Sequence, residues 1–280
     1  MYRLINYLFG FTVIYLFILE AGMYDHARIL TALVLSFIVG FVAFFGNWIT
    51  LDAIKAVVIL GTIILGFAGW LAATAIVFFF ISGSLLTRRN LKSGIVDDDK
   101  LEMDHHLQKR RDGYQIWANG FWIALFSIGY FLFSTNAFLI AVFVSIAAAT
   151  ADTWATEIGT YKPWKTVNIT TFKATEPGSD GGVSLKGTFA AISGAFAISI
   201  FILPGDFIFT STVFLIVFVF GFTGSVIDSI LGAILSDKNV SLSVPDDFSG
   251  TKAAYLNSFV NWISIGVSGL LALFTTQLMI

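Results

Sequence analysis

Long apolar segments constrain this chain more than any other feature. A helix needs about 20 apolar residues to cross the hydrocarbon core of a bilayer. Segments near that length cover residues 2–19, 29–45, 52–69, 70–86, 115–133, 136–156, 185–203, 211–235 and 253–276. Hydrophobic residues make up 57% of the chain and charged residues 12%, a balance outside the range of soluble domains. We therefore expect one all-α integral membrane domain over residues 1–280, a polytopic bundle of about nine transmembrane helices.

The positive charges predict the orientation of this bundle. Of the sixteen Lys and Arg residues, all but Arg28 fall on one side of the map of spans. Cytoplasmic loops of membrane proteins carry an excess of Lys and Arg. We therefore expect the N-terminus and the long loops at 87–113 and 159–184 to be cytoplasmic, in a protein of the plasma membrane.

Three acidic residues fall within or just after predicted spans. Asp152 and Glu157 lie near the end of the sixth span, and Asp228 lies late in the eighth. Ionisable groups are costly in a membrane, so they usually face a polar cavity or a partner. Small residues recur at helical spacing around Asp228: Gly221, Gly224, Ser225 and Gly232. They would let a ligand or another backbone approach, although helix packing alone also uses such residues.

Amide and hydroxyl side chains form stripes at the same predicted depth. One stripe comprises Asp112, Gln115 and Asn119, and the other comprises Asn257, Asn261, Ser264 and Ser268. These spacings place each set on one face of a helix. We expect the stripes and the acids to converge on one cytoplasmic polar pocket. Hydrogen bonds between helices are the competing explanation.

The segment "PGSDGGVSLKGT", residues 177–188, has the composition of an anion-binding loop. The amides of Gly178, Gly181 and Gly182 could form a nest, Ser184 could cap the next helix, and Lys186 would add a positive charge. The order of Lys186 and the residues after it differs from a Walker A loop, and no strand is expected before it. The alternative is an ordinary flexible loop leading into a membrane helix.

The acids and amides point to a hard cation. The chain has no Cys, and oxygen-rich sites favour Mg²⁺, which commonly bridges phosphates. Carboxylates alone would repel a phosphate, so a metal is expected between them. Arg110 and Arg111 could clamp a phosphate, or they could simply be positive anchors at a helix start.

Four motifs in this order resemble the integral-membrane family catalogued as domain of unknown function 92. The motifs are "HLQKRRDGYQIWANG", "ATADTWATEIG", "PGSDGGVSLKGT" and "GFTGSVIDSILGA", and the resemblance covers roughly residues 30–275. The family includes the phytyl-phosphate kinase of vitamin E metabolism. The resemblance implies a Mg²⁺-dependent kinase that transfers a phosphoryl group from a nucleoside triphosphate, CTP or ATP, to an isoprenyl monophosphate in the membrane.

This reaction gives each candidate residue an expected role. Those expected to act in catalysis are Asp152, Asp228, Glu157 and Lys186, the three acids also serving as metal ligands. Those expected to hold nucleotide phosphates are Gly178, Gly181, Gly182, Ser184 and Lys186. Those expected to bind the lipid substrate are Arg110, Arg111, Asp112, Gln115, Asn119, Asn257 and Asn261. Membrane lipids are expected partners, and nucleic acid is not.

Two other classes of function remain open from the sequence. A transporter or flippase for a lipid phosphate or another anion would also place carboxylates beside a cavity, but with charges at the midplane and paired repeats. A phosphotransferase of the CDP-alcohol type would share the "RDG" at Arg111, yet the rest of that motif is missing.

Overall fold

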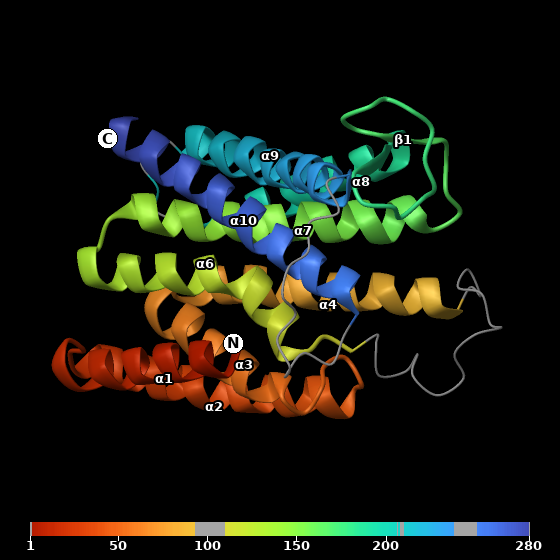
Figure 1. Ribbon diagram of the computed structural model, residues 1–280. Coiled ribbons are helices and arrows are strands. Elements are labelled where there is room, and N and C mark those ends of the chain that lie inside the picture. The colour runs from red at the N-terminus through yellow and green to blue at the C-terminus, as the bar shows by residue number, and fades with distance from the viewer. Residues whose placement is uncertain (1, 93–109, 206, 208–209, 238–250, 280) are drawn as a thin grey trace.

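The computed structural model describes residues 2–92, 110–205, 207, 210–237 and 251–279. Its membrane helices are α1 (Tyr2–Leu19), α2 (Met23–Phe45), α3 (Ala53–Ile63), α4 (Trp70–Lys92), α6 (Gly113–Phe133), α7 (Asn136–Thr160), α8 (Leu185–Ser199), α9 (Thr210–Asp237) and α10 (Lys252–Met279). A π-helix, η1 (Ile64–Ala68), continues α3, and a 3-10 turn, η2 (Ile200–Ile202), continues α8. Successive helices run back and forth through the bundle (Figure 1).

The prediction of an all-α polytopic membrane protein is confirmed. In the described part of the chain, eight helices are long and apolar enough to cross a membrane. The ninth apolar helix, α3 with η1, has 11 and 5 residues. At 1.5 Å per residue it extends about 24 Å, less than the roughly 30 Å of a hydrocarbon core. It ends at Gly69, whose φ of 87° allows the turn into α4.

Helix α7 is the centre of the bundle. Every residue from Ile140 to Ala151 is buried, which is typical of a helix surrounded by other helices on all sides. Small residues let its neighbours approach closely. Gly194 of α8 lies against the backbone of Ala151, and Gly224 of α9 lies against Ala148. Part of the glycine face around Asp228 therefore serves helix packing.

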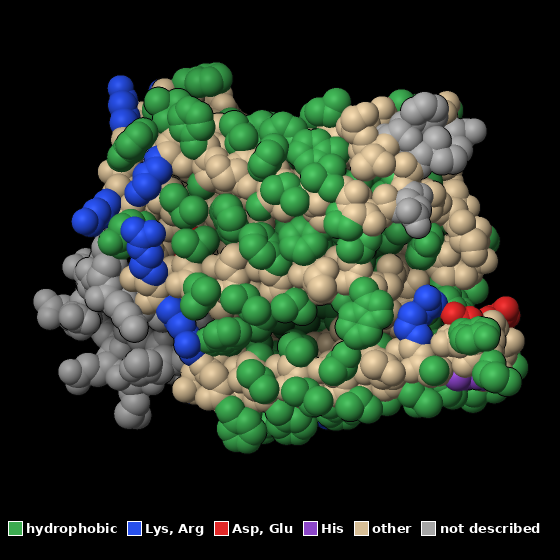
Figure 2. Space-filling view, turned by 180° about the vertical axis from the view of Figure 1, so that it is seen from behind, with side chains coloured by type: hydrophobic (Ala, Val, Ile, Leu, Met, Phe, Trp, Pro, Cys, Tyr) green, Lys and Arg blue, Asp and Glu red, His purple; other side chains and the backbone are tan. Residues whose placement is uncertain are grey.

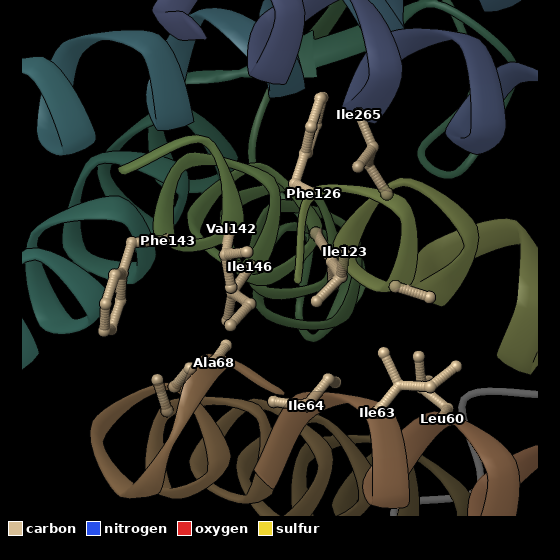
Figure 3. Close-up of a cluster of buried hydrophobic side chains, with 14 of the residues drawn as sticks. Leu60, Ile63, Ile64, Ala68, Ile123, Phe126, Val142, Phe143, Ile146 and Ile265 are labelled. Carbon is tan, nitrogen blue, oxygen red and sulfur yellow. The ribbon is translucent and has the colours of Figure 1, made fainter. Parts of the chain in front are cut away.

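An apolar core joins the N-terminal helices to the rest of the bundle. Figure 3 shows Ile63 and Ile64, on the α3–η1 helix, below Ile123 of α6 and Ile146 of α7. All four side chains are fully buried. This contact holds α3, despite its short length, firmly against the two central helices.

The surface is divided by charge along the bundle. Figure 2 shows Lys and Arg side chains gathered at one end, a broad hydrophobic band in the middle, and acidic and histidine side chains with a basic group at the other end. Arg28, the exception in the sequence, forms an ion pair with Asp25 at 2.9 Å and donates from Nε to the Gly66 carbonyl. We call the Lys- and Arg-rich end the basic end.

The connection between α7 and α8 contains a small hairpin. Strand β1 (Thr166–Asn168) pairs antiparallel with β2 (Gly182–Ser184), and β2 leads directly into α8. The expectation that no strand precedes the segment 177–188 was therefore wrong, because β1 lies before it and three-residue strands give little periodic signal. Helices α4 and α7 also extend beyond the predicted spans, to Lys92 and Thr160. Much of the predicted 87–113 loop lies outside the described residues.

Candidate functional site

Two cavities adjoin one another near the basic end of the bundle. The first, of about 340 Å³, lies among α7, α8, α9, α10 and the glycine-rich segment. The second, of about 730 Å³, lies among α4, α6, α7, α10 and the chain around Trp48 and Arg111. Asp152, Thr156 and Asn257 line both. The single polar pocket expected from the sequence is thus two cavities with a shared wall.

Asp152 and Asp228 face each other in the first cavity. Their carboxyl groups interact directly, although they come from α7 and α9. Asp228 is buried, with 8% of its surface exposed. At 1.5 Å per residue, Asp152 lies about 12 Å inside the end of α7, deeper than the helix-end position expected from the sequence.

Helix α10 holds Asp228 in place. Ser264 Oγ donates to Asp228 Oδ2 at 3.0 Å. Asn261 Nδ2, in the amide orientation that satisfies its partners, donates to the same oxygen at 2.8 Å. The polar stripe of α10 therefore orients an acid on α9. A buried carboxylate needs such donors, since an unsatisfied one is costly.

The first cavity is acidic. Asp152, Asp180 and Asp228 line it, and no Lys, Arg or His is among its described lining residues. The described chain has no cluster of three or more His, Cys, Asp or Glu side chains able to hold a metal. A pair of carboxylates nevertheless fits Mg²⁺, which usually takes one or two carboxylates and fills its other positions with water and phosphate oxygens.

Glu157 does not join the pair of aspartates. Its Oε1 accepts a hydrogen bond from Thr87 Oγ1 at 2.5 Å, and its Oε2 accepts one from Asn90 Nδ2 at 2.7 Å. It lines only the second cavity. The assignment of Glu157 as a metal ligand beside Asp152 is therefore revised: a five-residue separation turns the two side chains about 140° apart on α7.

The glycine-rich segment packs on α9 at the first cavity. Gly178 and Gly181 have positive φ values of 84° and 73°, and a Cβ at Gly181 would collide with Ala233. The Gly182 amide donates to the Ser179 carbonyl at 2.9 Å, so it is committed within the loop and cannot serve an anion nest as expected.

Ser184 caps α8 as predicted, whereas Lys186 lies outside the first cavity. Ser184 Oγ accepts from the Gly187 amide at 3.1 Å, so the positive end of the α8 dipole is directed at the first cavity. Lys186 Nζ donates to the carbonyls of Tyr161 and Lys162 at the end of α7. It does not line the cavity, and the expected contact of Lys186 with nucleotide phosphates is not supported by its position.

Three arginines line the second cavity: Arg88, Arg110 and Arg111. Among the described residues, no carboxylate lies within ion-pair distance of them. Arg110 Nη2 donates to Asn47 Oδ1, while its buried Nε has no hydrogen-bond partner. Buried donors without partners are rare in folded proteins, so this cavity is suited to an anion.

Arg111 is fixed from several directions. Its backbone amide donates to the Trp48 carbonyl at 3.0 Å, and its own carbonyl accepts from the Thr50 amide at 3.1 Å. Its guanidinium lies over the rings of Phe79 and Phe80, 5.1 Å and 5.5 Å from their centres. Burial lowers the pKa of Arg111 to about 10, an effect that the nearby Glu157 carboxylate opposes. The side chain therefore remains a cation at neutral pH.

The predicted amides also reach the second cavity. Gln115 and Asn119 line it from α6, and Asn257 and Asn261 line it from α10. Asp112 does not, because its side chain caps α6 by accepting from the Gln115 amide at 2.8 Å. Burial raises the pKa of this Asp112 carboxyl, and the hydrogen bond from Gln115 opposes the shift.

Two charged lining residues, Arg88 and Asp180, were not assigned a role from the sequence. Arg88 follows a membrane span, where a positive anchor is equally common, so nothing in the pattern separated it from its neighbour Arg89. Asp180 stands inside the glycine-rich motif, but its direction depends on how the loop folds onto α9.

Comparisons with known proteins agree with this architecture. The family model described as "Integral membrane protein DUF92" matches residues 34–274. An uncharacterized membrane protein of Methanocaldococcus jannaschii is 34% identical over 184 residues, which cover 65% of this chain and 72% of that protein. No solved structure matches the chain.

Proposed function

The chain belongs to the DUF92 family of integral membrane proteins, and we propose that it is a kinase acting on a lipid phosphate. It would transfer a phosphoryl group from a nucleoside triphosphate, CTP or ATP, to an isoprenyl monophosphate held in the bilayer, and so form the diphosphate. The observation that carries this proposal is the pair of adjoining cavities, one acidic and one lined by arginines, with Asp152 in their shared wall.

Each cavity suits one of the two substrates. The first combines two facing carboxylates with the N-terminal end of α8, an arrangement that suits metal-bound nucleotide phosphates. The second offers Arg110 and Arg111 to the acceptor phosphate, and arginine binds phosphate oxygens through paired hydrogen bonds. Because the cavities lie at the end of a membrane bundle, a lipid tail can stay among apolar side chains while its head group enters.

The transfer itself requires positioning more than covalent chemistry. An oxygen of the acceptor phosphate forms a bond to the γ-phosphorus. The bond from that phosphorus to its bridging oxygen breaks, and the electron pair leaves with the nucleoside diphosphate. The acceptor is already ionised, so no residue has to remove a proton from it. Arg110 and Arg111 would orient the acceptor and offset its charge.

Asp152 and Asp228 would hold Mg²⁺, which would offset the charge of the nucleotide phosphates during transfer. Ser264 and Asn261 would keep the Asp228 carboxylate aimed into the first cavity through the bonds described above. Glu157 would not bind the metal directly, because its two carboxylate oxygens accept hydrogen bonds from Thr87 and Asn90.

We also infer that both cavities open toward the cytoplasm of a cell whose plasma membrane holds the protein. The support is the collection of Lys and Arg side chains at the basic end, since such residues favour the cytoplasmic side. Nucleoside triphosphates are available on that side.

A direct assay tests the kinase proposal. Purified protein in lipid nanodiscs is incubated with Mg²⁺, γ-labelled ATP or CTP, and isoprenyl monophosphates of several lengths. We expect labelled isoprenyl diphosphate, and we expect Asp152→Asn and Asp228→Asn to abolish it.

Asp25→Asn is the matched control, because Asp25 pairs with Arg28 at the opposite end of the bundle. It should retain activity. Absence of diphosphate with every donor and acceptor would contradict the proposal, as would full activity in both cavity variants.

A further inference from the structure

The connection after α7 forms a positively charged arm, residues 161–175. It contains Lys162, Lys165 and Lys173 and no Asp or Glu. All three lysines are exposed. The arm is therefore a compact cationic surface at the basic end of the bundle, where a bilayer would present its head groups.

Two large aromatic side chains project from the same arm. Trp164 has 57% of its surface exposed, and Phe172 has 80% exposed. Neither side chain contributes to the described hydrophobic core. Aromatic residues flanked by lysines are typical of segments that lie in the membrane interface, with rings among the head groups and ammonium groups near lipid phosphates.

The arm holds Phe172 in a costly conformation. Its φ of 56° is in the left-handed region, which is unfavourable for a bulky residue. The turn before it is ordered: Asn168 Oδ1 accepts from the amides of Thr170 and Thr171 at 3.0 Å and 3.1 Å, and the Phe172 amide donates to the Asn168 carbonyl at 2.8 Å. The backbone thus presents this ring outward rather than burying it.

The arm lies in the connection between the ends of two membrane helices, α7 and α8. It begins directly after Thr160 at the end of α7, and β1 within it pairs with β2, which continues into α8. On the first turns of α8, Leu185 and Phe189 are 69% and 64% exposed, as lipid-facing residues are. Strands of three residues extend only about 10 Å, so the arm stays close to this surface.

We propose that the arm binds anionic phospholipid head groups of the surrounding leaflet, with Trp164 and Phe172 inserted at the interface and the lysines paired with lipid phosphates. Each lysine near an anionic surface contributes attraction that depends on lipid charge. The proposal is independent of the kinase reaction.

The same contact would steady the outer wall of the first cavity. Thr166 and Ile169 of the arm line that cavity. The Ile169 amide donates to the Gly181 carbonyl at 2.9 Å, so the arm is hydrogen-bonded to the glycine-rich segment. Lipid binding by the arm would therefore affect the position of the glycine-rich segment, which packs on α9.

Spin labelling tests this proposal directly, since the chain has no Cys to remove. A nitroxide is attached to Phe172→Cys, and its accessibility to oxygen and to a water-soluble nickel complex is measured in nanodiscs. With a phosphatidylcholine and phosphatidylglycerol mixture, we expect nickel accessibility at least two-fold lower than with phosphatidylcholine alone, and oxygen accessibility correspondingly higher.

Two further proteins complete the test. A label at Glu176→Cys, exposed just beyond the arm, should be equally accessible to nickel in both membranes. The triple change of Lys162, Lys165 and Lys173 to Gln should remove the effect of phosphatidylglycerol on the label at position 172. The proposal is overturned if the label at position 172 has the same nickel and oxygen accessibility in both membranes, whether the label is exposed to water or inserted. It is also overturned if the triple variant keeps the full effect of phosphatidylglycerol.

Discussion

Gly83 of α4 lies directly against the guanidinium of Arg111: a Cβ at Gly83 would be only 2.5 Å from Arg111 Nη2. The missing side chain is what lets this cation sit between α4 and α7 in the second cavity. A glycine in a membrane helix, which by itself indicates only close packing, thereby fixes the position of a proposed substrate ligand.

Gly83→Ala should consequently weaken acceptor binding. The added methyl group would displace the guanidinium, and a lost charge-assisted hydrogen bond costs roughly 1.5–3 kcal/mol. We expect the KM for isoprenyl monophosphate to rise about 10- to 100-fold, with a smaller change in kcat. Gly10→Ala is the control, because a Cβ there meets Ile59 at an ordinary 3.8 Å. An unchanged KM in Gly83→Ala would argue against Arg111 as an acceptor ligand.

Asp228→Asn should stabilise the metal-free protein while abolishing activity. The substitution replaces one of two facing buried carboxyl groups with a neutral amide, and the asparagine oxygen can still accept from Ser264. We expect about 1 kcal/mol of added stability, seen as a rise of roughly 2–4 °C in melting temperature. Adding Mg²⁺ should raise the melting temperature of the wild type and leave the variant unchanged. A lower melting temperature in metal-free buffer would show that the pair is not under repulsion.

Gly181→Ala and Gly178→Ala should differ in their effects on the glycine-rich segment. Both substitutions place a side chain in the left-handed region, at a cost of roughly 1–2 kcal/mol. Only the methyl group at Gly181 would also collide with α9, at Ala233. We expect Gly181→Ala to detach the loop, which limited proteolysis between residues 170 and 182 would detect, and Gly178→Ala to remain resistant. Equal cleavage of the two variants would contradict this packing.

Glu157→Gln should leave the dependence on Mg²⁺ unchanged. The amide can still accept from Thr87, and the side chain lies outside the acidic cavity. The Mg²⁺ concentration that gives half-maximal activity should therefore stay within about two-fold of the wild type, whereas a lost metal ligand typically costs far more affinity. A large increase in that Mg²⁺ concentration would instead support Glu157 as a metal ligand.

The helices were predictable because each follows from a local property of the sequence. An apolar run of the right length forms a membrane helix wherever it lies, and the boundaries of α1, α6 and α10 fall within two or three residues of the predicted ones. The α3–η1 helix, residues 53–68, also follows its predicted span of 52–69, and the larger departures are the start of α2 at Met23 and the end of α4 at Lys92.

The candidate site was predictable only as a set of residues. Ser184 was identified as a helix cap because capping involves residues three apart in the chain. The separation of Glu157 from Asp152 could have been read from their five-residue spacing on one helix. The hydrogen-bond partners of Lys186 could not have been predicted in this way, because its long side chain reaches carbonyls 24 and 25 residues away in the chain.

The sequence by itself determined that this protein is a bundle of membrane helices with its polar residues toward one end, since hydrophobic length and the distribution of Lys and Arg act locally along the chain. Only the tertiary structure decided that the polar residues divide between two cavities. Asp152 meets Asp228 from another helix, and Arg111 meets Gly83, through packing of small residues in α7, α9 and α4. The physical reason is that such contacts depend on the rotation and closeness of helices far apart in sequence, which no local pattern specifies.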